Sequence, residues 1–203
     1  MPSKDVDFST GRQLEEKHFR EKERELIQRL KQKALKEAAR KALSEAVGVS
    51  DEGILHTLEE MGYDKERVIA LHLFPLVAVA WADGKISKEE REKVVAAARA
   101  SGIHQGTAAD KTLHAWLKSK PDETTTNRAL RIIRDIMRFR GPEDQVDYQD
   151  NIMQLSTGIA EASGSLLGLG RKISAAERKV LERVAGELTA SHQAAAKKIL
   201  AKS

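Results

Sequence analysis

Four arginines in one segment of the chain have a spacing suited to ligand chemistry. Arg128, Arg131, Arg134 and Arg138 recur every three or four residues, so they share one side of a helix whose other side is apolar. A guanidinium group binds phosphate or carboxylate through parallel hydrogen bonds. This ridge predicts a surface for phosphate groups or an acidic partner, and the alternative is a solvated face paired with neighbouring acids. No aromatic residue interleaves the arginines, which disfavours nucleic acid as the ligand.

The other residue types that could support catalysis do not form recognisable motifs. The six histidines are scattered and show no local zinc-binding pattern, and the chain has no cysteine. The glycine-rich run 164–172 lacks the Walker spacing and a preceding strand, so its leucines are expected either in the core or at a partner surface. No nucleophile elbow is present. We therefore expect a protein that is not an enzyme.

Composition indicates that these residues are carried by helices. Of 203 residues, 33% are charged and 4% are aromatic, and no segment alternates with the period of a strand. The sequence predicts an all-α fold with a disordered tail over 1–11, a long helix over 12–47 and a helical domain over 48–203. The longest apolar run is too short to span a membrane, so no membrane insertion is expected. The missing cysteines suit a cytoplasmic protein.

Turn residues mark the helices within the predicted domain. Pro75 lies inside an apolar helical pattern from Asp64 to Ala82 and should kink or split it, because proline lacks a backbone donor. Near the C-terminus the pattern predicts one helix from Ser174 to about Thr189 and a separate last helix over 191–202.

A short phrase, KIS-x-x-ER, occurs twice, at Lys85–Arg91 and at Lys172–Arg178. The residues before it also match, which indicates two structural repeats over about 64–103 and 143–190. Each phrase contains Ser-x-x-Glu, the capping box, in which serine and glutamate satisfy backbone N–H groups at a helix start. Most of the repeated phrase is therefore explained by helix initiation.

The first copy, LVAVAWADGKISKEEREKVVAAARASGI, resembles the signature of the tellurite-resistance TerB-like family, and the similarity extends over about residues 50–190. The resemblance implies a pseudo-two-fold helical bundle from a bacterial stress-related protein. It also implies a divalent metal ion near the Ala-Asp-Gly turn, and the matching positions are Asp83 and Glu90. The spacing does not meet the calcium-loop pattern, and the alternative is that Asp83 pairs with backbone or a cation at the turn.

The start of the long helix combines dense charge with isolated apolar residues. Residues 15–32, EEKHFREKERELIQRLKQ, are similar to the inhibitory helix of the mitochondrial ATP-synthase inhibitor protein family, through a pattern that includes Phe19, Arg20, Glu25 and Leu30. That resemblance implies a helix that inserts into a rotary ATPase and blocks turnover. From the residues alone, this helix is either solvated and held by ion pairs or lies against a partner.

Three functional hypotheses follow. The first is a non-enzymatic TerB-like binding or adaptor protein that engages a protein partner through its N-terminal helix. The second is an inhibitor of a rotary ATP synthase that uses the same helix, and the third is a divalent-metal-binding tellurite- or stress-resistance protein. A homodimer formed through the N-terminal helix is a further alternative. The candidate contact residues are those of the helix and of the arginine ridge: Phe19, Arg20, Glu25, Leu26, Leu30, Arg128, Arg131, Arg134 and Arg138.

Overall fold

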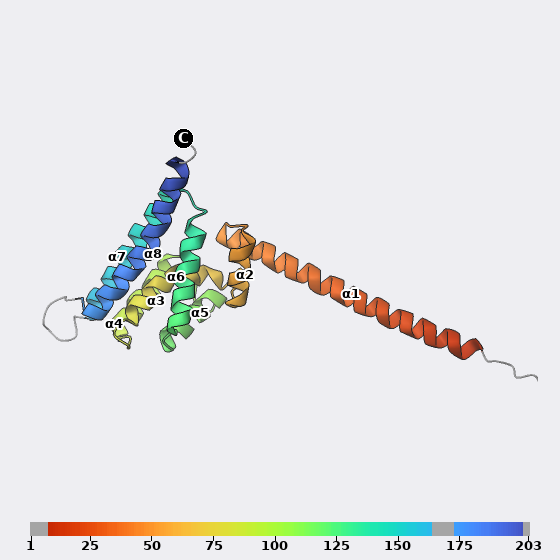
Figure 1. Ribbon diagram of the computed structural model, residues 1–203. Helices are drawn as coiled ribbons and strands as arrows, with labels where there is room; N and C mark the ends of the chain where they lie inside the picture. The colour runs from red at the N-terminus through yellow and green to blue at the C-terminus, as the bar shows by residue number, and fades with distance from the viewer. Residues whose placement is uncertain (1–7, 164–172, 201–203) are drawn as a thin grey trace, which may run out of the picture. The chain divides into compact units, whose positions relative to one another are not determined.

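The computed structural model describes residues 8–163 and 173–200, and every regular element in this part of the chain is a helix (Figure 1). Side chains are described over 16–162 and 173–188. The predicted all-α class is therefore confirmed. The chain divides into two compact units, Met1–Lys41 and Ala42–Ser203.

The first unit consists of most of helix α1 (Phe8–Val47). This helix begins at Phe8, four residues before the predicted start at residue 12. The second unit begins at Ala42, ahead of the predicted domain start at residue 48. The reason is packing: Leu43 and Val47, near the end of α1, are buried in the core of the second unit.

After the end of α1, the described residues of the second unit form one 3-10 helix and seven α-helices. They are α2 (Glu52–Glu60), η1 (Val68–Leu73), α3 (Phe74–Ala80), α4 (Lys88–Ala100), α5 (Ala108–Lys118), α6 (Glu123–Met137), α7 (Pro142–Ser163) and α8 (Ala175–Leu200). Pro75 divides the predicted helix as expected. It lies in the first turn of α3, where its missing N–H leaves no helical hydrogen bond unmade. The predicted break near residue 190 is wrong, because α8 is continuous. No proline or strong capping signal interrupts its sequence there.

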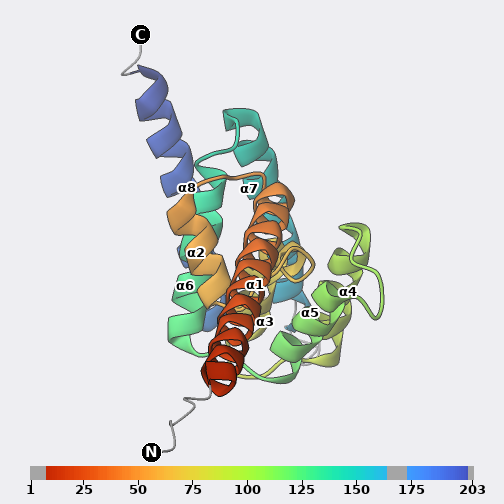
Figure 2. The same cartoon turned by 90° about the vertical axis from the view of Figure 1, so that its right-hand side faces the viewer.

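Helix α3 is the centre of the second unit. Its sequence, FPLVAVA, is apolar on every side, and it contacts α4, α5, α6, α7 and α8. Figure 2 shows α3 between α6 and α8 on one side and α4 and α5 on the other. Phe74 meets the Trp116 ring edge to face, with 5.1 Å between ring centroids. A short helix without charge can therefore anchor five amphipathic ones.

The two copies of the repeated phrase begin α4 and α8 with the same hydrogen bonds. Glu90 Oε2 accepts from the Ser87 N–H at 2.7 Å, and Glu177 Oε2 accepts from the Ser174 N–H at 2.6 Å. In return, each serine Oγ accepts from the glutamate N–H, at 3.2 and 3.1 Å. Both predicted capping boxes are confirmed.

Candidate functional site

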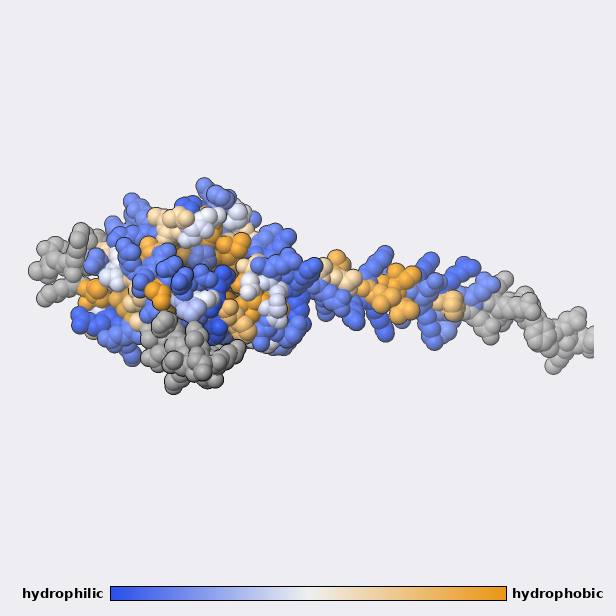
Figure 3. Space-filling model, turned by 90° about the horizontal axis from the view of Figure 1, so that it is seen from above, coloured by the Kyte–Doolittle hydropathy of each residue, from blue (hydrophilic) through white to orange (hydrophobic). Residues whose placement is uncertain are grey.

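Helix α1 carries an apolar stripe on a charged surface. The large apolar side chains exposed along this helix are Phe19 (71%), Leu26 (57%), Ile27 (44%), Leu30 (57%) and Leu35 (71%), of which Leu35 lies on the face opposite the stripe. Phe19, Leu26 and Leu30 lie seven and four residues apart, so they fall on one face of the helix. In Figure 3 apolar side chains interrupt the hydrophilic surface of this helix. Large apolar side chains gathered on one exposed face are typical of a contact surface.

Charged residues around the stripe are unevenly distributed. Arg20 pairs with Glu16 at 3.3 Å one helical turn away, and Glu25 is exposed nearby. Beyond Leu26 the helix becomes basic, because Arg29, Lys31, Lys33, Lys36, Arg40 and Lys41 are opposed by Glu37 alone up to the end of the first unit. The predicted contact residues of α1 thus lie where mixed charge gives way to positive charge.

The arginine ridge is largely engaged within the second unit. Arg128 pairs with Glu60 at 3.1 Å, and Arg138 pairs with Asp135 at 3.2 Å. Arg134 is only partly exposed and joins α6 to α8 through Glu187 at 2.7 Å. Arg131 is exposed and makes no ion pair within the described part of the chain. The geometry favours the alternative of a face paired with neighbouring acids, and it leaves one arginine free for a ligand.

The acidic turn before α4 is organised by the backbone. Asp83 is exposed and accepts a hydrogen bond from the Lys85 N–H at 3.2 Å. Glu90 is 2% exposed and its carboxylate caps the helix at Ser87. Burial raises the pKa of the Glu90 carboxyl, the hydrogen bonds from Ser87 oppose this, and the charges of Asp83 and Glu177 add to the rise. The repeat therefore brings two buried capping glutamates within electrostatic reach of one another.

A metal ion at this turn would need further ligands. Among the residues whose side chains are described, no three His, Cys, Asp or Glu side chains gather as a metal site requires. Divalent ions such as Ca²⁺ take six or more oxygen ligands. The arrangement of Asp83 and Glu90 favours helix capping and turn formation over metal binding.

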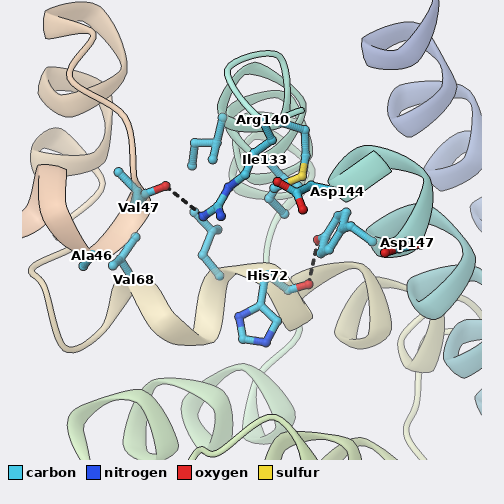
Figure 4. Close-up of a pocket in the computed structure, with 12 residues that line it drawn as sticks. Ala46, Val47, Val68, His72, Ile133, Arg140, Asp144 and Asp147 are labelled. Carbon is cyan, nitrogen blue, oxygen red and sulfur yellow. Dashed lines mark hydrogen bonds between the residues drawn. The ribbon is translucent and has the colours of Figure 1, made fainter. Parts of the chain in front are cut away.

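Sequence reasoning missed a cavity of about 360 Å³ in the second unit (Figure 4). Its apolar lining is mostly buried and comes from the end of α1, from η1 and from α6: Ala46, Val47, Val68, Leu71, Ile133, Ile136 and Met137. Polar residues from the α6–α7 turn and from α7 complete it. No sequence motif marks it, because its walls come from segments about a hundred residues apart. Asp144 and Asp147 lie near the start of α7, a position that favourable interaction with the helix dipole explains without any ligand.

Most polar groups around the cavity already have partners. Arg140 Nη2 donates to the Val47 carbonyl at 3.1 Å, and the Tyr148 hydroxyl donates to the His72 carbonyl at 2.8 Å. In Figure 4 the His72 imidazole points away from Asp144 and Asp147. Burial lowers the pKa of His72 against the opposing effect of a hydrogen bond with the Ile69 backbone, which favours the neutral imidazole. Asp144 and Asp147 are exposed and have no ion-pair partner among the described side chains.

A second group that the sequence did not reveal joins α4 to α5. The buried Asp110 carboxylate accepts from the Gly106 N–H at 2.8 Å and pairs with Arg99 at 2.8 Å. His114 Nδ1 lies 3.2 Å from the same carboxylate. The Gly106 hydrogen bond is the main cause of the lowered pKa of Asp110, and Arg99 and His114 add to it against the opposing effect of burial. All of its donors come from its own two helices and their turn, so the group is structural.

Comparisons with known proteins found no match. No family model matches the chain, and neither a curated protein nor a solved structure does. The glycine-rich run 164–172, with its leucines, lies outside the described residues. Among the described helices, none has both the length and the apolar character needed to cross a bilayer.

Proposed function

We propose that this chain is a non-enzymatic, cytoplasmic TerB-like binding protein that engages a protein partner through helix α1. The observation that carries the proposal is the apolar stripe of Phe19, Leu26 and Leu30, whose side chains are more than half exposed. The TerB-like assignment, and with it a role in stress resistance, is supported by the Ala-Asp-Gly turn and the capped helix starts described above.

The chemistry of the stripe indicates how a partner would hold it. A helix that presents apolar side chains at intervals of three, four and seven residues fits an apolar groove. The basic side chains between Arg29 and Lys41 flank that face. The complementary surface is therefore an apolar groove rimmed by carboxylates, since opposite charges guide association and fix the register of the helix.

A matched pair of double variants tests this proposal. Leu26→Glu with Leu30→Glu places two charges on the apolar stripe, whereas Gln28→Glu with Gln32→Glu adds the same charge at the same spacing on the opposite face. We expect proteins captured from native lysate by the full chain to be lost with the first variant and retained with the second. Equal capture by the unchanged chain and both variants would show that the stripe binds no partner.

A rotary ATP synthase is the second candidate partner. Phe19 at 71% exposure beside the Glu16–Arg20 ion pair favours it, because these residues belong to the segment that resembles the inhibitory helix. An inhibitor should slow ATP hydrolysis by the purified enzyme, and Phe19→Ala should relieve the inhibition. Unchanged hydrolysis at micromolar concentrations of the full chain would leave the adaptor hypothesis alone.

A further inference from the structure

The cavity in the second unit divides into an apolar floor and a polar rim. Val47, Val68 and Ile133 are buried on the floor, whereas Asp144 and Asp147 are exposed at the rim. Its volume of about 360 Å³ falls in the lower part of the range for small-molecule pockets. A ligand that fits both parts has an apolar body and one polar end.

The groups at the rim that have no partner determine which charge the polar end of the ligand should carry. The Tyr148 hydroxyl is committed to the His72 carbonyl, and one arm of the Arg140 guanidinium is committed to the Val47 carbonyl. Asp144 and Asp147 have no ion pair among the described side chains, and their spacing of three residues places both on one face of α7. Two carboxylates against one engaged guanidinium leave an excess of negative charge beside an apolar surface.

We propose that this cavity binds a small molecule with an apolar body and a protonated amine. The carboxylates of Asp144 and Asp147 hold the amine, and Val68, Ile133 and Met137 of the cavity lining contact the apolar body. An ammonium group supplies three N–H donors, which suits two acceptor-only carboxylates. The site involves no residue of the first unit and does not depend on the partner proposed for α1.

Three probes with the same alkyl chain separate the contribution of the charged end from that of the apolar body. Hexylamine, 1-hexanol and hexanoate share an apolar body and carry a positive, neutral or negative end at pH 7. Titration of the full chain, followed by NMR chemical shifts of backbone amides, should place hexylamine at η1, α6 and the start of α7. We expect hexylamine to bind about tenfold more tightly than hexanoate, with hexanol between them.

Variants at the rim locate the charge. Asp144→Asn and Asp147→Asn should each weaken hexylamine about two- to fivefold, which is the scale of an exposed ion pair, and leave hexanol unchanged. Asp150→Asn removes an exposed carboxylate of the same helix that does not line the cavity, and it should have no effect. These side chains are exposed, so the variants should fold, and their unfolding midpoints check this.

A bulky residue at the rim tests the apolar part. Ala46 is exposed where α1 ends beside the cavity, and Ala46→Trp should weaken hexylamine and hexanol by the same factor. Tighter binding of hexanoate than of hexylamine would overturn the proposal and assign an anion site to Arg140. Absence of shifts around the cavity with millimolar hexylamine would show a packing void and also overturn it.

Discussion

Helix α1 and helix α6 both carry apolar residues among basic ones, but they use these apolar residues in opposite ways. Within the first unit α1 leaves Phe19, Leu26 and Leu30 exposed, whereas α6 buries Leu130 and Ile133 against its own domain. Their arginines differ too. Arg20 pairs within its own helix, whereas Arg134 joins α6 to α8. The spacing of apolar residues along a helix therefore does not determine whether the chain itself covers the apolar face.

The largest expected difference between the two regions comes from a matched pair of phenylalanines. Phe74 is fully buried in α3 and contacts Trp116, whereas Phe19 is exposed in α1. Phe74→Ala should lower the free energy of unfolding by about 3–5 kcal/mol, because it removes apolar contacts and leaves a cavity. Phe19→Ala should change it by less than about 0.5 kcal/mol. Urea denaturation of both variants measures the contrast, and equal losses would mean that Phe19 is covered in solution.

A smaller and pH-dependent effect is expected at Asp110. Its pKa lies below the ordinary value of 3.8, so the folded state holds the ionised carboxylate more firmly than the unfolded chain does. The resulting stability is fully present above about pH 4 and is lost as the pH falls through the lowered pKa. Asp110→Asn should therefore lower the free energy of unfolding by about 1–3 kcal/mol at pH 7 and by progressively less below pH 4.

Urea denaturation of the unchanged chain and of Asp110→Asn at pH 7, 4 and 3 measures this difference. A control variant, Asp150→Asn, changes an exposed carboxylate of α7 that makes no ion pair among the described side chains, and it controls for general acid effects. The role of the Asp110 charge would be contradicted if the difference in free energy of unfolding between the unchanged chain and Asp110→Asn stayed constant down to pH 3.

The smallest effects distinguish arginines within the ridge itself. Arg134 bridges α6 and α8 through Glu187 in a partly buried position, and Arg134→Ala should destabilise the protein by about 1–2 kcal/mol. Arg131 is exposed on the same helix, so Arg131→Ala should change the free energy of unfolding by less than about 0.5 kcal/mol. Thermal unfolding checks both values. If Arg131→Ala proved the more damaging, an unrecognised partner of that side chain would be indicated.

Local chemistry explains why parts of this fold could be predicted from the sequence. The capping boxes at Ser87 and Ser174 involve residues three apart, and the division at Pro75 follows from a missing N–H group. The continuity of α8 was predicted wrongly. The residues near 190 carry only weak stop signals, and a pattern of this kind does not decide whether a helix ends or continues. Predictions about the candidate surfaces were less complete, since pairing of Arg128 with Glu60 joins residues 68 positions apart.

The sequence by itself determined the all-α class and the capped starts of α4 and α8, because these depend on contacts within a few residues. Only the tertiary structure decided which apolar face is covered and which arginine is free. It also formed the cavity, by bringing Val47 beside Arg140, 93 residues further along the chain. Such contacts depend on how whole helices pack, and packing responds to the shapes of many side chains at once, which no local pattern encodes.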